Sequence, residues 1–109
     1  MKIVKELIKR QYELTFLIPA SYTAAELADT KKELEALVKK YKGKILEQAE
    51  WGKKSLAYKI KKEGKTYDAA FYFHWLLKFE SNKVQEFEKF LYLNHHVIRH
   101  LLIVKEEEK

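Results

Sequence analysis

Apolar and polar residues alternate along residues 10–19, which read RQYELTFLIP. A period of two places every second side chain on the same face of an extended chain, so a strand is predicted from Arg10 to Pro19. Proline ends the pattern because it has no amide hydrogen to donate to a neighbouring strand. The face predicted to point into the core carries Tyr12, Leu14, Phe16 and Ile18.

After Thr23 the pattern changes to that of a helix. Thr23 and Glu26 fit a capping box, and Gly43 is a common helix stop, so a helix is predicted from Thr23 to about Lys42. Its apolar residues recur at spacings of three, four and seven: Leu27, Leu34, Leu37, Val38 and Tyr41. A second helix is predicted to begin at a Ser81 cap, with an apolar face made of Val84, Phe87 and Leu91.

Three more strands are predicted. One runs from Lys44 to about Ile60 with a bend at Gly52, and the next from about Lys65 to Phe79, after a turn at residues 63–65. One face of that strand carries Phe71, Phe73, Trp75, Leu77 and Phe79, and the other carries Tyr72, His74, Leu76 and Lys78. The last strand, over residues 97–105, is rich in valine and isoleucine, which favour extended structure.

The resulting order, β-α-β-β-α-β, predicts a ferredoxin-like α+β fold: a four-stranded antiparallel sheet with both helices on one face. The domain is expected to span residues 10–105, between a basic extension at 1–9 and a charged tail at 106–109. The uncovered face would carry Leu17, Tyr72, His74 and Leu76. Such a patch is typical of a protein-binding surface, although scattered apolar side chains are common on any monomer.

Composition and charge exclude several classes of protein and favour a polyanionic partner. The chain has 109 residues, 47% of them hydrophobic, and its 22 basic and 16 acidic residues give a net charge of +6. One globular domain with a polyanionic partner is expected. The sequence has no cysteine, which excludes disulfides and thiol catalysis. No apolar run approaches the roughly 18 residues of a membrane span, and residues 1–10 lack the apolar core of a signal peptide, so a cytoplasmic protein without a membrane partner is expected.

Six lysines fall within residues 53–65, where only Glu63 opposes them: Lys53, Lys54, Lys59, Lys61, Lys62 and Lys65. Lysines beside a hairpin can hold a phosphate backbone by releasing its counterions, without reading its sequence. A lysine-rich hairpin can equally be a solvated edge that prevents aggregation. Charge alone leaves both interpretations open.

The segment WGKKSLAYKI at residues 51–60 closely resembles the G-K/R-K/R-x-L-A-Y-x-I segment of ribosomal protein six of the bacterial small subunit. Two other matches fall in the same order: Tyr12-Glu13 in the first strand and NHHVIR at residues 94–99. The resemblance covers about residues 10–105. It implies a non-enzymatic structural protein, without cofactor, metal or small-molecule substrate. The implied partners are the central domain of 16S ribosomal RNA and ribosomal protein eighteen, with which the family forms a heterodimer.

Carried over residue by residue, the resemblance makes Lys53, Lys54 and Arg99 candidate RNA contacts, with Arg10 just before the Tyr-Glu pair. Tyr72, His74 and Leu76 match the third-strand face and are assigned, with Leu17, to the protein partner. The chain departs from the family pattern at Lys59, where proline is common, in the additional residues 1–9, and at His95-His96.

Two aromatic residues flank the lysine pair and bear on the same assignment. Tyr58 is a candidate for stacking on an unpaired base, whereas Trp51 is expected to pack in the core or at the edge, on the long second strand. A metal site at His95, His96 and His100 is disfavoured by their spacing. The alternatives in function are an RRM-like single-strand binder, a homodimeric regulator and an acyl phosphatase. The RRM motif is not matched at residues 65–71, and the loop at residues 19–22 lacks the glycine and arginine that a phosphatase needs.

Overall fold

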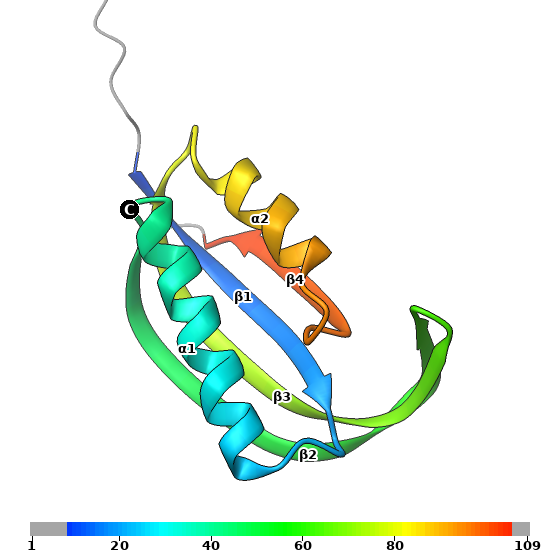
Figure 1. Cartoon of the computed structure of the whole chain (residues 1–109). Helices are drawn as coiled ribbons and strands as arrows, with labels where there is room; N and C mark the ends of the chain where they lie inside the picture. Colours follow the sequence, from blue (N-terminus) through cyan, green and yellow to red (C-terminus); the bar gives the residue numbers. More distant parts are fainter. Residues whose placement is uncertain (1–8, 106–109) are drawn as a thin grey trace, which may run out of the picture.

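The structure is a computed structural model that describes residues 9–105 (Figure 1). Strands β1 (Lys9–Pro19), β2 (Lys44–Lys62), β3 (Lys65–Glu80) and β4 (Arg99–Val104) form one antiparallel sheet in the order β2-β3-β1-β4. Helices α1 (Ala24–Lys40) and α2 (Val84–Leu93) both lie on one face of it. The predicted ferredoxin-like α+β fold is therefore confirmed. The proposed extension, apart from Lys9, and the tail at 106–109 fall outside the described residues.

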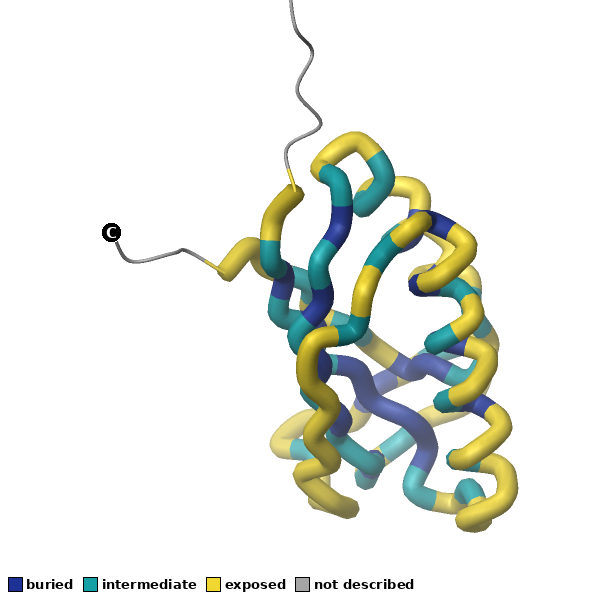
Figure 2. The backbone as a smooth tube through the Cα atoms, turned by 90° about the vertical axis from the view of Figure 1, so that its left-hand side faces the viewer, coloured by how far each residue is buried: buried dark blue, intermediate teal, exposed yellow. Residues whose placement is uncertain are grey.

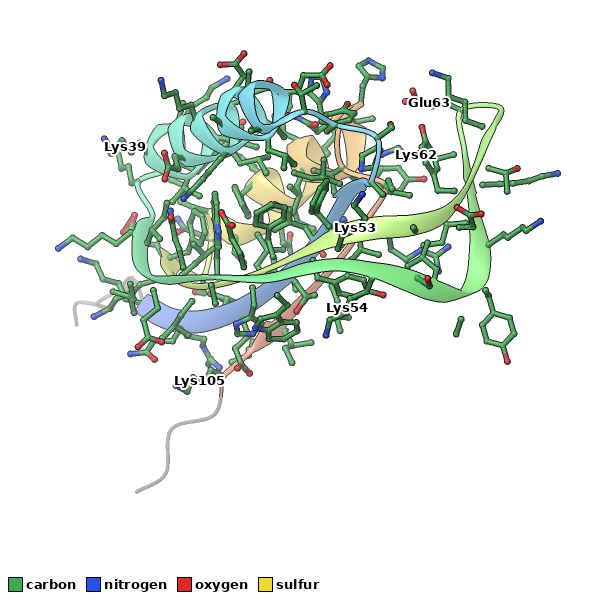
Figure 3. The ribbon with its side chains drawn as sticks, turned by 90° about the horizontal axis from the view of Figure 1, so that it is seen from below. Lys39, Lys53, Lys54, Lys62, Glu63 and Lys105 are labelled. Carbon is green, nitrogen blue, oxygen red and sulfur yellow. The ribbon has the colours of Figure 1, made fainter. Side chains whose placement is uncertain are left out.

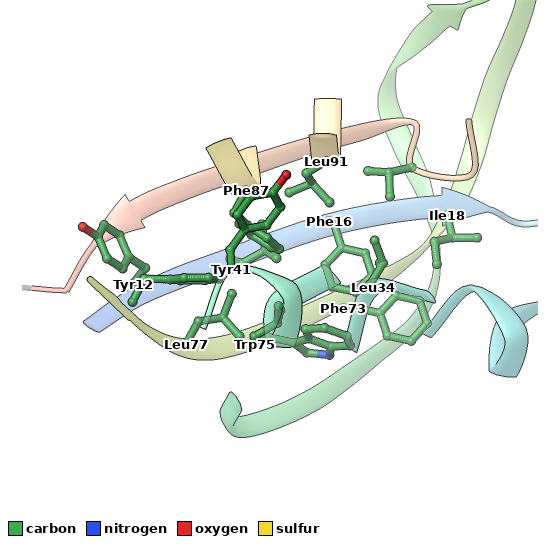
Figure 4. Close-up of a cluster of buried hydrophobic side chains, with 14 residues drawn as sticks. Tyr12, Phe16, Ile18, Leu34, Tyr41, Phe73, Trp75, Leu77, Phe87 and Leu91 are labelled. Atoms are coloured by element: carbon green, nitrogen blue, oxygen red, sulfur yellow. The ribbon is translucent and has the colours of Figure 1, made fainter. Parts of the chain in front are cut away.

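The core lies between the sheet and the two helices (Figures 2 and 4). The alternating residues of β1 and β3 point into it as their period predicts, and their rings pack closely. Phe16 stacks on Phe73 with ring centroids 5.1 Å apart and meets Trp75 edge-on at 5.0 Å. The helices cover these rings with Leu34, Val38, Phe87 and Leu91.

Helix α1 begins and ends with defined hydrogen bonds. The predicted capping box is present: the Glu26 amide donates to Thr23 Oγ1 at 3.2 Å, and the Thr23 amide donates to Glu26 Oε1 at 2.8 Å. At the other end Lys42 takes the left-handed conformation (φ 60°), and the Gly43 amide donates to the Val38 carbonyl at 2.9 Å. Lys42, and not Gly43, therefore has the positive φ at this helix end. Glycine is required at position 43 because a Cβ there would lie 2.4 Å from Cε1 of Phe79.

Two predicted boundaries are wrong. Ser81 does not cap α2, whose N-cap residue is Lys83 and has no side-chain cap. The reason is that β3 continues to Glu80, so residues 81–83 form the turn out of the strand, closed by the Lys83 amide donating to the Glu80 carbonyl at 2.9 Å. The last strand begins at Arg99 rather than Val97, because a turn and a bend within residues 95–98 lead the chain from α2 into the sheet.

The hairpin of β2 and β3 is longer than the rest of the sheet, and its end curls toward the helix side (Figure 3). Glu63 and Gly64 both have positive φ, 52° and 78°, as a two-residue hairpin turn of the mirror-image type requires. Gly52 (φ 84°) lies at a shift in strand register, which accounts for the predicted bend. A second, smaller apolar cluster consists of Leu17, Ile60, Ala70 and Ile98.

Candidate nucleic-acid and protein interface

The face of the sheet opposite the helices is left uncovered by every element within residues 9–105 (Figure 3). Strand register aligns residues of β3, β1 and β4 in two rows across this face: Glu13 pairs with Leu76 and Ile103, and Thr15 pairs with His74 and Leu101. Leu101 is 60% exposed and Ile103 47% exposed. The predicted open face therefore exists, and β4 extends its apolar surface to the edge of the sheet.

Aromatic rings and one lysine form a connected row across this face. The Trp51 ring stacks on the His74 ring, with centroids 5.0 Å apart and planes within 9° of parallel. Lys54 Nζ lies 6.0 Å from the Trp51 ring centre and 5.7 Å from that of Tyr72. His74 Nε2 in turn lies 3.6 Å from Glu13 Oε1. We call these five residues, Glu13, Trp51, Lys54, Tyr72 and His74, the open-face row.

Trp51 does not pack into the core: its ring stacks on His74 of β3 and is 49% exposed, on the open face. The register shift at Gly52 accompanies this placement, and the period-two pattern does not reveal it. Leu17 lies on the predicted face opposite Tyr72 but is only 8% exposed, because it belongs to the second apolar cluster. Tyr72, His74 and Leu76 thus offer more contact surface than Leu17 does.

The lysine pair that the motif places side by side is divided between the two faces of the sheet. Successive side chains of a strand point in opposite directions. Lys54 lies over Tyr72 on the open face, whereas Lys53 Nζ lies 5.7 Å from the ring centre of Phe71, which packs against the main core (Figure 3). One flat RNA surface on this part of the sheet can use only one of the two.

The other candidate RNA contacts are also spread out. Arg10 pairs with Phe79 at one end of β1, and Arg99 pairs with Leu17 near the other end. Seven residue steps separate them along β1, which corresponds to about 23 Å. Tyr58 is 86% exposed, in the stretch between Ser55 and Ile60 where the pairing of β2 with β3 is irregular. The structure thus brings Lys54 to Tyr72 but leaves Arg10, Arg99 and Tyr58 in separate places.

The basic side chains share one electrostatic property. Among the described residues, every ion pair involves a histidine, and no lysine or arginine nitrogen lies within 4.0 Å of a carboxylate oxygen. Exposed cations without a carboxylate partner are free to exchange their water and counterions for phosphate oxygens. This property favours binding of a polyanion by the lysine-rich hairpin.

Lys62 differs from the other hairpin lysines because its side chain donates hydrogen bonds to the backbone of another segment. Its Nζ donates to the Asn94 carbonyl at 2.9 Å and to the Val97 carbonyl, so it ties the hairpin to the segment before β4. Burial lowers the pKa of Lys62 below its ordinary value of 10.5, and the nearby Glu63 carboxylate opposes this shift. The sequence pattern, which groups Lys62 with five solvated lysines, does not distinguish it.

Lys62→Met is expected to lower the free energy of unfolding at pH 7 by about 1–2 kcal/mol, because two backbone carbonyls lose their donor. With a lowered native pKa, the unfolded chain binds more protons between that pKa and 10.5, so Lys62 gives the wild type added stability as pH rises through this window. The difference in stability between wild type and variant should therefore grow as the pH rises toward 10.5. Urea unfolding at pH 7, 9 and 10 measures it, with the exposed Lys61→Met as control; equal losses in both variants would contradict the assigned tie.

The three histidines that follow α2 in the sequence contact different partners. His95 Nδ1 lies 2.7 Å from Glu63 Oε1, His96 Nδ1 lies 2.6 Å from the Tyr22 hydroxyl, and His100 Nε2 lies 3.0 Å from Glu88 Oε2. Burial raises the pKa of Tyr22, with smaller contributions from neighbouring acidic groups. Among residues 9–105 no cluster of three or more His, Cys, Asp or Glu side chains is close enough to share a metal ion. Neither helix in this range could span a bilayer.

Comparison with known proteins identifies the family. The family model described as ribosomal protein S6 matches residues 11–104. The chain belongs to the ribosomal protein S6 family. The small ribosomal subunit protein bS6 of Syntrophomonas wolfei is 27% identical over 100 residues, which cover 91% of this chain and 99% of that protein. The ribosomal protein S6 structure from Thermotoga maritima superposes with a TM-score of 0.78, at 23% identity, over 90% of this chain and 89% of that one; it supports the fold.

A longer plant protein also contains a region similar to this S6 chain. The chloroplastic protein Regulator of Fatty Acid Composition 3 from Arabidopsis thaliana is 32% identical over 90% of this chain, but that region is only 30% of the plant protein. The S6 family is structural and non-enzymatic. This S6 chain is accordingly a structural component of the small ribosomal subunit in the cytoplasm, where it is part of a ribonucleoprotein and its partner is ribosomal RNA.

Proposed function

We propose that this ribosomal protein S6 binds the central domain of 16S ribosomal RNA together with ribosomal protein eighteen, as a heterodimer, and acts without catalysis or a cofactor. The observation that carries the proposal is the uncovered sheet face, with half-exposed Trp51, Leu101 and Ile103 on it. A patch of this kind on a small monomer is typical of a surface that a second protein buries. We assign Tyr72, His74 and Leu76 to that contact, and Leu17 to its edge.

The RNA-binding part of the proposal rests on charge. We assign phosphate contacts to Arg10, Lys53, Lys54 and Arg99, and a base contact to Tyr58. The lysines and arginines lack carboxylate partners within the described range, and such cations bind phosphates with an affinity that falls steeply with salt. Because these residues lie apart, the RNA would have to pass over more than one side of the protein, or the partner would have to complete the basic surface.

A titration of the chain against a central-domain RNA fragment, at two salt concentrations and with or without ribosomal protein eighteen, tests the proposal. Salt-sensitive binding that needs the second protein is the expected result. Equal binding by the chain alone would instead favour an independent single-strand binder, and dimerisation of the chain alone would favour a homodimer on the same face. Absence of binding in both mixtures would overturn the proposed partners.

Charge reversal of the lysine pair should weaken RNA binding and leave the fold intact. Each of the single variants Lys53→Glu and Lys54→Glu is expected to lower the salt slope by about one and the affinity by about tenfold, because each removes one of the assigned phosphate contacts. Filter binding at four salt concentrations measures both values, with Lys39→Glu on the exposed end of α1 as control. An unchanged slope in the Lys53→Glu/Lys54→Glu double variant would refute the assignment.

A further inference from the structure

A cavity of about 750 Å³ lies between the end of the β2–β3 hairpin and the segment that joins α2 to β4. Lys61 and Glu63 line it from the hairpin, Tyr92 from α2, and Ile98 and Arg99 from the start of β4. Its walls come from parts of the chain about 30 residues apart in sequence. The Lys62 bonds to two backbone carbonyls hold these walls together, and so does the 2.7 Å contact of His95 with Glu63. The cavity is therefore a fixed feature of the fold.

The charge of this cavity is positive. Lys61 and Arg99 are exposed in its lining, and neither has a carboxylate within 4.0 Å among the described residues. The one acidic group in the lining, Glu63, already accepts the contact from His95. Two unpaired cations on facing elements can hold an anion between them, and guanidinium and ammonium groups together suit a phosphate.

An aromatic ring stands on the wall that α2 provides. Tyr92 is 70% exposed, and it also borders a second cavity of about 380 Å³ that shares His100. Within the described residues its ring has no stacking or cation partner. A volume of 750 Å³ lies in the range of cavities that hold one small ligand, which a single nucleotide is. A free tyrosine face beside two free cations suits a base that carries a phosphate.

We propose that this cavity binds one unpaired nucleotide of RNA, with its phosphate between Lys61 and Arg99 and its base stacked on Tyr92. The inference rests on the proposed function, since it takes ribosomal RNA as the polyanion. A base inside a duplex is stacked on its neighbours and cannot reach a tyrosine in a cavity, so the site selects single-stranded RNA such as a loop or bulge.

Amide NMR titration of the full chain tests the site, with a single-stranded RNA tetranucleotide as the probe. Shifts are expected around Lys61, Tyr92 and Arg99, and a blunt RNA duplex of equal charge should bind elsewhere or more weakly. Tyr92→Ala should weaken tetranucleotide binding about tenfold while Tyr92→Phe keeps it, because stacking needs the ring and not the hydroxyl. Arg99→Gln should lower the salt slope by about one. Phe90→Ala, which removes a partly exposed ring of the same helix outside the cavity, is the matched control.

Several results would overturn this inference. One is equal weakening of tetranucleotide binding by Tyr92→Ala and Phe90→Ala, or no weakening by Tyr92→Ala. A second is that the RNA duplex, or inorganic phosphate at the same concentration, causes the same amide shifts as the tetranucleotide. A third is that an acidic peptide shifts these amides and the tetranucleotide does not. The test with central-domain RNA and ribosomal protein eighteen separates the two proposals: unchanged assembly of Tyr92→Ala rejects the cavity alone, whereas failure of the wild type to bind that RNA rejects the proposed function.

Discussion

A charge at position 76 is expected to weaken the association with ribosomal protein eighteen more than a hundredfold, with Leu76→Lys as the variant to make. Leu76 lies in the middle of the open face, on a central strand, and contact with a partner would bury its side chain. Taking a charged side chain out of water and into an apolar contact costs several kcal/mol, which exceeds the loss from removing the apolar contact alone. Isothermal titration of the variant with the partner protein measures the effect.

Lysine is a better choice here than aspartate because of the neighbouring strands. Leu76 pairs with Glu13 of β1 and with Glu47 of β2. An aspartate at this position would place a third carboxylate between those two, so Leu76→Asp should cost the monomer about 1 kcal/mol more than Leu76→Lys. The control is Leu93→Lys, an exposed leucine of α2 away from this face. Wild-type affinity in Leu76→Lys would remove the open face from the proposed interface.

Gly43→Ala is expected to destabilise the fold by about 3 kcal/mol, a large effect for one added methyl group. The new Cβ would lie 2.4 Å from Cε1 of Phe79. That ring is 1% exposed and packs on Phe87 with ring centroids 4.7 Å apart, so it has little room to move aside. Chemical denaturation monitored by tryptophan fluorescence measures the loss.

A double-mutant cycle with Phe79→Leu identifies the cause of that loss. Phe79→Leu lowers the free energy of unfolding by some amount in the wild type. If the clash with the ring causes the loss in Gly43→Ala, the same substitution made in the Gly43→Ala background should lower it by at least about 1 kcal/mol less. Gly52→Ala is a useful contrast, since a Cβ there meets nothing within 4 Å and only the positive φ of 84° opposes it. Additive losses in the cycle would show that the ring is not what forbids a side chain at Gly43.

The sequence predicted the fold well because its strongest signals are local and repeated. The period-two pattern of Tyr12 to Ile18, together with the capping box at Thr23, corresponds directly to hydrogen bonds and burial in the structure. Ser81 misled the prediction because a serine in a turn and a serine at a cap have the same appearance in sequence. Only the pairing of Glu80 with Lys9 shows that the strand continues so far.

The candidate sites were less predictable, since they depend on irregular pairing and on long-range contacts. Trp51 reaches the open face near a register shift, and Lys62 is partly buried because residues 94–97 lie against the hairpin. The basic pair at Lys53 and Lys54 forms one motif in sequence but divides between two faces in space. The open face itself was predictable, because counting the elements leaves no helix to cover it.

The unpaired cations of this protein have a consequence for its behaviour away from the ribosome. With a net charge of +6 and no close carboxylate beside any described lysine or arginine, the free chain is under mutual repulsion among like charges. Dissolved salt screens that repulsion, and so does a bound polyanion. Rising ionic strength should therefore make the isolated chain harder to unfold and, at the same time, weaken its binding to RNA. In the ribosomal subunit the phosphates of the RNA neutralise the same cations that dissolved anions screen in the free protein.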